Sequence, residues 1–162
     1  MLTSPTPSEL KSVTVANLGI VLAQGGARVV IVDVNMRQPQ QHVLFQLPIG
    51  RGLTDVLYQT KPQVNDVLQN TDVAGLQVLT VGSLQPPHPT ELLGSARMGD
   101  LLGELSNQFD IVLCDSAHAV AIADAVVLST HVDGAVLVVD IGKTRRATAE
   151  QAVRNLRQTG VN

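Results

Sequence analysis

The sequence predicts an α/β protein in which a mainly parallel sheet lies between two layers of helices. Four short runs rich in Val, Ile and Leu, at residues 28–33, 76–81, 110–115 and 133–140, have the length and composition of strands buried on both faces. Segments with helical periodicity separate these runs, and this alternation favours right-handed crossovers between parallel strands. Aromatic residues make up only 2% of the chain, so the core must consist of aliphatic side chains.

Length and composition narrow the class of protein. A chain of 162 residues is most simply one domain, residues 1–162, and is long enough to bury a core. The net charge of −3, without a basic block or aromatic stacking platforms, argues against nucleic-acid binding. The single cysteine, Cys114, suits a reducing compartment. No signal peptide and no apolar run near the ~20 residues that span a bilayer is visible, so we expect a cytoplasmic protein without direct membrane insertion.

Residues 4–12 have the outline of a phosphate-binding loop that opens a helix. They read Ser-Pro-Thr-Pro-Ser-Glu-Leu-Lys-Ser, and helical spacing continues over residues 9–24, where two glycines end the helix. In a working loop of this kind, backbone N–H groups surround the β-phosphate, the lysine reaches the outer phosphates and the hydroxyl ligates Mg²⁺. Lys11 and Ser12 stand where this chemistry needs them. The simpler alternative is a solvated loop that caps a helix.

Two carboxylates follow predicted strands. Asp33 and Asp115 each end a buried run at its C-terminal edge, where open α/β sheets bind ligands. In nucleotide hydrolases such an acid holds a Mg²⁺-bound water. We therefore expect both carboxylates beside Lys11, although Asp33 has the alternative of a strand-ending cap. Cys114 points away from Asp115 along the strand, which predicts a small buried residue and not a nucleophile.

The rest of the chain follows the same alternation. Residues 38–70 are predicted to be largely irregular, with two short helices separated near Pro62. Little apolar sequence precedes the loop and no buried run follows the final helix, so we expect the first and last strands to be lacking and the chain to be truncated at both ends. The remaining predicted helices span residues 53–58, 64–68, 90–109 with a break at Gly94, 121–130 and 143–159.

Taken together, these segments resemble the cytoplasmic domain of the bacterial tyrosine kinases that work in capsule and exopolysaccharide export, a branch of the P-loop ATPases related to the partitioning ATPases. The family's loop, Ser-Pro-x-Pro-Gly-Glu-Gly-Lys-Ser-Thr, corresponds to residues 4–13, and its Asp-x-Asp-x-Arg element to residues 33–37. Residues 86–95 are similar to its Pro-Asn-Pro-Ser/Thr-Glu-Leu-Leu segment, which generic ATPases lack. Residues 115–118, Asp-Ser-Ala-His, stand for its Asp-Thr-Pro-Pro.

This resemblance implies a three-layer P-loop NTPase-type fold and an ATP- and Mg²⁺-dependent protein-tyrosine kinase. It also implies a membrane-embedded polysaccharide co-polymerase or adaptor as partner, a position at the inner face of the plasma membrane through that partner, and self-association. The residues carried over are Lys11, Asp33 and Asp115 as catalytic, Ser8, Glu9, Leu10, Lys11, Ser12 and Val13 as nucleotide-binding, and Ser12, Asp33 and Asp115 as metal-binding.

The sequence also departs from the family pattern. Ser8 and Leu10 replace loop glycines, Asn35 replaces the second Asp, both prolines after Asp115 are gone, and the C-terminal tyrosine cluster is absent from this chain. If the loop needs a glycine conformation, Leu10 costs about 1–3 kcal/mol, and its side chain intrudes on the phosphates. Asn35 cannot act as a carboxylate base. The sequence therefore predicts an impaired kinase, with two alternatives: an inactive regulatory or structural relative, or a partitioning-type ATPase.

Overall fold

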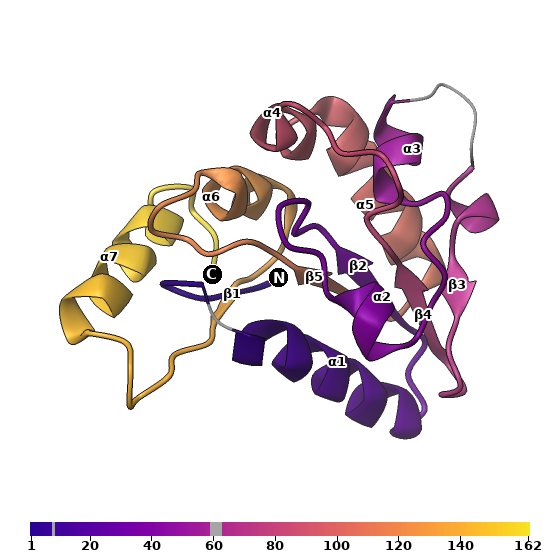
Figure 1. The fold of residues 1–162 in the computed structure, drawn as a ribbon, viewed down its shortest axis with the longest axis horizontal. Helices are drawn as coiled ribbons and strands as arrows, with labels where there is room; N and C mark the ends of the chain where they lie inside the picture. Colours follow the sequence, from indigo (N-terminus) through magenta and orange to yellow (C-terminus); the bar gives the residue numbers. More distant parts are fainter. Residues whose placement is uncertain (8, 59–62) are drawn as a thin grey trace.

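A computed structural model describes residues 1–7, 9–58 and 63–162, and these residues form one sheet covered by helices (Figure 1). The strand order is β3-β4-β2-β5-β1-β6. Every neighbouring pair is parallel except β3 with β4. The predicted α/β class with a mainly parallel sheet is therefore confirmed. The strands are β1 (Leu2–Thr3), β2 (Val29–Asp33), β3 (Gln69–Asn70), β4 (Leu76–Leu79), β5 (Ile111–Asp115) and β6 (Val136–Leu137).

Helices cover both faces of the sheet, and the alternation of side chains along β2 divides the core between them. Val29 and Ile31 pack with the α1 side, whereas Val30 and Val32 pack with the side of α5 and α7. Figure 1 shows α1 below the sheet and α4, α5 and α6 above it. The helices are α1 (Glu9–Gln24), α2 (Gln41–Leu44), α3 (Leu53–Tyr58), α4 (Pro89–Leu93), α5 (Ala96–Gln108), α6 (Asp124–Leu128) and α7 (Arg146–Arg157), with 3₁₀ turns η1 (Val64–Asp66) and η2 (Ser129–His131).

The expectation that the first strand is lacking is wrong. Leu2 and Thr3 form β1 in the middle of the sheet, between β5 and β6. The N–H of Ser116 donates to Leu2 O at 3.1 Å, and the N–H of Val138 donates to Thr3 O at 2.8 Å. The sequence hides this strand because two residues give no periodicity and because Thr3, although fully buried, is polar. Its hydroxyl is satisfied by Ala117 O at 2.7 Å.

Most other predicted elements are present with changed lengths. The helix over residues 9–24 and the break at Gly94 are confirmed. The helix predicted at 64–68 is only the 3₁₀ turn η1, and the strand predicted over 133–140 shortens to β6, which has the two-residue β1 as its partner. The antiparallel strand β3 has no counterpart in the prediction. Pro62 lies outside the described residues, and truncation of the chain stays a prediction.

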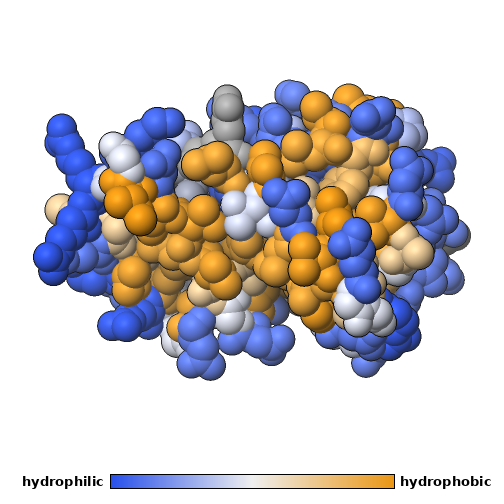
Figure 2. Space-filling view, turned by 90° about the horizontal axis from the view of Figure 1, so that it is seen from below, coloured by the Kyte–Doolittle hydropathy of each residue, from blue (hydrophilic) through white to orange (hydrophobic). Residues whose placement is uncertain are grey.

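The exposed side of α1 is unusually apolar. Figure 2 looks at the molecule from this side and shows apolar side chains gathered across it. Leu10, Val13 and Val21 of α1 are all exposed, Val21 by 64%. Lys11 lies in the first turn of the same helix. Among the described residues, no helix is both long enough and apolar enough to cross a membrane.

A glycine where α3 begins permits a close approach to the end of β4. A Cβ built on Gly52 would lie 2.3 Å from Thr80 O and 2.5 Å from Gly82 N, which are both backbone atoms. We therefore expect Gly52→Ala to lower the free energy of unfolding by about 1–3 kcal/mol, because the loop must move away from the strand. Urea unfolding measures the change.

Gly103 provides the matched control for this substitution. It lies inside α5, and a Cβ there meets no atom within 4 Å. Gly103→Ala should stabilise the protein by about 1 kcal/mol through helix propensity alone. Equal effects of the two substitutions would contradict the assignment of Gly52 to a close backbone contact.

Candidate functional site

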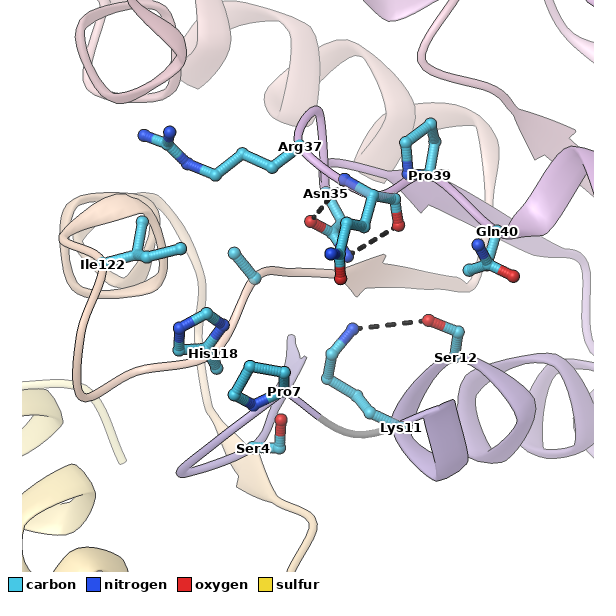
Figure 3. A pocket seen from close by; sticks show the side chains of 12 residues that line it. Ser4, Pro7, Lys11, Ser12, Asn35, Arg37, Pro39, Gln40, His118 and Ile122 are labelled. Carbon is cyan, nitrogen blue, oxygen red and sulfur yellow. Dashed lines mark hydrogen bonds between the residues drawn. The ribbon is translucent and has the colours of Figure 1, made fainter.

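A cavity of about 760 Å³ opens at the carboxyl edge of the sheet (Figure 3). Its walls come from the loop after β1, the first turn of α1, the loop after β2 and the loop after β5. This is the edge at which open α/β sheets bind their ligands. The lining residues are Ser4, Pro7, Lys11, Ser12, Asn35, Arg37, Gln38, Pro39, Gln40, Ala117, His118 and Ile122.

Lys11 projects from α1 into this cavity and contacts the carboxylate of Asp115. The lysine is 3% exposed and Asp115 is fully buried, so the pair is shielded from water. Lys11 Nζ also lies 3.5 Å from Ser12 Oγ. The structure thus brings together three residues that the sequence assigned to one site, from a helix and a strand 104 positions apart.

Asp33 and Asp115 lie side by side, because their strands β2 and β5 pair in that register. Asp33 is fully buried, and its oxygens accept hydrogen bonds from the N–H groups of Asn35 (3.2 Å), Gln40 (3.0 Å) and Gln41 (3.0 Å). Burial, and then the charge of Asp115, raise the pKa of Asp33 to about 7 although these bonds act in the opposite direction. Asp33 therefore stabilises the loop after β2 through its backbone N–H groups, and its side chain does not line the cavity.

Gln41 is a site residue that sequence reasoning missed. Its Nε2 donates to Asp115 Oδ2 at 2.7 Å and to Ser12 O at 3.1 Å, and the whole residue is buried. Its Oε1 is buried and has no hydrogen-bond partner among the described residues. Nothing in the sequence marks this glutamine, because it belongs to a four-residue helix without periodicity.

The donor set around Ser12 fits a hard cation that keeps most of its ligands as water or phosphate oxygens. Ser12 and the carboxylates of Asp33 and Asp115 offer only oxygen, which Mg²⁺ prefers, and the unpartnered Gln41 Oε1 can accept from a bound water. Within residues 1–7, 9–58 and 63–162, no three His, Cys, Asp or Glu side chains form a preassembled cation cage. The metal roles of Ser12, Asp33 and Asp115 stay predictions.

The loop after β2 is fixed at one end by an ion pair. Arg37 Nε lies 2.8 Å from Asp124 Oδ2, and Arg37 Nη2 lies 3.3 Å from Asp124 Oδ1. Asp124 is 1% exposed and also accepts the hydroxyl of Thr90. The sequence located the arginine and the segment containing Thr90 but gave Asp124 no role. Asn35, in the same loop, donates from Nδ2 to Gln38 O at 2.9 Å.

The predicted nucleotide-binding residues divide into two groups. Lys11 and Ser12 line the cavity, whereas the side chains of Leu10 and Val13 are exposed and do not. Leu10 is part of helix α1, and among described residues other than glycine only Gln46 has a positive φ. The strain expected at Leu10 is therefore not found, because the helix already begins at residue 9. Ser8 lies outside the described residues, and the part played by Glu9 stays a prediction.

Comparison with solved structures first shows the fold class to which this chain belongs. The MinD septum site-determining protein of Pyrococcus horikoshii matches with a TM-score of 0.79 at 19% identity, over 99% of this chain and 65% of that one, which places the chain among proteins with the P-loop ATPase fold. The kinase domain of the Escherichia coli tyrosine kinase ETK matches with a TM-score of 0.94 at 32% identity, over all of this chain and 63% of that one. No model of a known protein family matches.

Curated relatives then show the particular family. The chain is 33% identical to the putative tyrosine-protein kinase CapB of Staphylococcus aureus, over 99% of its own length and 69% of CapB. It is 41% identical to the tyrosine-protein kinase YwqD of Bacillus subtilis, over 94% of its length and 63% of YwqD. The chain belongs to the bacterial tyrosine kinases. It spans about two thirds of these two relatives.

Proposed function

We propose that this chain is the Mg·ATP-binding domain of a protein-tyrosine kinase that acts in capsular or exopolysaccharide production, with nucleotide binding kept and phosphoryl transfer weakened. The observation that carries the proposal is the position of Lys11 and Ser12 at the start of α1, facing the cavity and adjoining the strand-end carboxylates Asp115 and Asp33. A helix N-terminus with a lysine is suited to phosphate, because its N–H groups and dipole favour an anion.

Each residue has a definite part in this proposal. Lys11 would exchange its contact with Asp115 for the outer phosphates. The Ser12 hydroxyl would ligate Mg²⁺, and Asp33 and Asp115 would hold its bound waters. When bound there, Mg²⁺ would supply charge neutralisation on the phosphates. The first turn of α1, including Leu10, would contribute backbone N–H groups, because a helix leaves its first four N–H groups without an intrahelical partner. The N–H of Val13 lies beyond these four, so its assignment as a nucleotide-binding residue has less support.

Weakened transfer follows from position 35. The resemblance places a carboxylate there, and Asn35 has no group that accepts a proton at neutral pH. Its side chain is engaged with Gln38, so it is not free to orient an acceptor hydroxyl. Impairment of nucleotide binding by Leu10 has less support, because Leu10 has helical backbone geometry and an exposed side chain.

The family also suggests where the domain acts. A membrane-embedded polysaccharide co-polymerase or adaptor would hold it at the inner face of the membrane, with self-association of the kinase domains. Membership of the tyrosine kinase family supports this assignment. An inactive regulatory relative is the second candidate, favoured by Asn35 and by the contact that already engages Lys11 with Asp115.

Calorimetry with Mg·ATP separates these two candidates. We expect the native chain to bind and Leu10→Gly to change Kd by less than about threefold. In a separate transfer assay, Asn35→Asp should raise phosphorylation of a tyrosine peptide by about tenfold, because it adds a second group that can accept the proton. The Leu10 variant serves as the matched control, because it also restores a family residue but outside the cavity lining. Absence of binding by the native chain at millimolar Mg·ATP would contradict the proposal and favour the regulatory candidate.

A further inference from the structure

The element that follows β2 presents no free proton acceptor to the cavity. Asn35 carries a carboxamide, which is not a base, and its Nδ2 donates to Gln38 O at 2.9 Å. Asp33 is fully buried, both its oxygens accept backbone N–H groups, and it is not part of the cavity lining. A kinase with this loop needs another group to take the proton of the hydroxyl that it phosphorylates.

His118 lies in the same cavity, on the loop between β5 and α6. Figure 3 shows its ring on the same side of the cavity as Lys11 and Pro7, with Asn35 and Arg37 on the other side. The residue is half-buried, so part of its side chain packs against the protein while part remains accessible from the cavity. Among the described lining residues, His118 alone has a side chain that takes up a proton near neutral pH.

The surroundings of His118 keep its imidazole neutral. Burial lowers its pKa below the usual value near 6.5, and the positive charges of Lys11 and Arg37 lower it further, while the carboxylate of Asp124 acts in the opposite direction. A neutral imidazole has a free lone pair at pH 7, which is the form that a general base requires. The same Lys11 is the residue expected to bind the outer phosphates, so the base and the transferred group would share one site.

We propose that His118 is the general base of this chain, and that it takes the proton from the acceptor tyrosine in place of a carboxylate at position 35. This inference rests on the proposed function. The phenolic oxygen forms a bond to the γ-phosphorus, the bond from that phosphorus to the bridging oxygen of ADP breaks, and the phenolic proton moves to the imidazole. The imidazolium then releases the proton to water, so the products are phosphotyrosine, ADP and one proton.

Steady-state kinetics with Mg·ATP and a synthetic Glu/Tyr copolymer test this role between pH 5.5 and 9. His118→Gln should lower kcat by about 10²–10⁴-fold, the usual contribution of a positioned base, and change KM for ATP by less than about threefold. The native rate should rise with pH through the imidazole pKa below 6.5 and then level off, and His118→Gln should lose that limb. Asn35→Asp added to His118→Gln should restore at least about tenfold, because a carboxylate replaces the missing base.

His88→Gln is the matched control, since His88 is an exposed loop histidine outside the cavity lining, and it should leave kcat and its pH profile unchanged. The role is overturned if His118→Gln transfers within about threefold of the native rate, if it keeps the acid limb, or if the native chain binds Mg·ATP but transfers no phosphate. The last result would leave the proposed binding function standing, whereas absence of Mg·ATP binding would end both.

An NMR titration of the native imidazole is independent of catalysis and of how the variant folds. It should give a pKa for His118 below 6.5, and a value above 7 would overturn the role.

Discussion

Replacing Lys11 with methionine is expected to abolish measurable Mg·ATP binding and to lower the free energy of unfolding by about 3–5 kcal/mol. The lysine is 3% exposed and contacts Asp115, which is fully buried. Methionine keeps the length of the side chain and removes its charge, so Asp115 would retain only the amide of Gln41 as a side-chain partner among the described residues. Uncompensated buried charge is costly, and the loss of the lysine also removes the cation that meets the phosphates.

Chemical denaturation and calorimetry on three variants check this expectation. Lys11→Met combined with Asp115→Asn should recover most of the stability but none of the binding, because the buried charge is gone while the phosphate ligand is still missing. Arg28→Met provides a contrast: Arg28 pairs with Asp110 at the surface, where solvent screens the charges, and its loss should change stability little. A Lys11→Met protein as stable as the native one would show that Asp115 is not a buried charge.

Stability of the nucleotide-free protein is expected to fall as pH rises from about 4 to 7. The pKa of Asp33 is raised from 3.8 in the unfolded chain to about 7 in the fold. Between these values the folded state binds more protons than the unfolded state, so each step upward in pH favours unfolding. This one group can account for at most about 4 kcal/mol over that interval, at 1.36 kcal/mol for each pH unit.

Asp110 has the opposite effect on the pH dependence of stability, because its pKa is lowered in the folded state. Hydrogen bonds from the Arg28 side chain and backbone lower its pKa to about 2, so its contribution is present above pH 4 and is lost as the pH falls towards 2. Stability should therefore be highest near pH 4, with only a small decrease below it because the Arg28–Asp110 pair is exposed. Urea unfolding in Mg²⁺-free buffer measures this profile. Asp33→Asn should flatten the slope from pH 4 to 7 whatever its absolute stability. Stability that increases over this interval would contradict a protonated Asp33.

The elements predicted well from sequence are those long enough for their buried residues to form a recognisable hydrophobic pattern. The helix over residues 9–24 and the strands β2 and β5 contain enough aliphatic residues to have a period or a continuous run. Lys11, Asp33 and Asp115 were found because each stands at the end of such an element. β1 and β3 were not predicted, because a strand of two residues shows no hydrophobic period. Their positions in the sheet depend on pairing with other strands.

The sequence by itself determined the alternating α/β order, the strand-end carboxylates and the lysine that opens α1, because local spacing and chain order are enough to set them. Only the tertiary structure decided which side chains meet: Gln41 donates to Asp115, Asp124 pairs with Arg37, His118 lines the cavity, and Leu10 is exposed. The physical reason is that these relations depend on how loops close over the carboxyl edge of the sheet, and loop closure is governed by contacts between residues far apart in the chain.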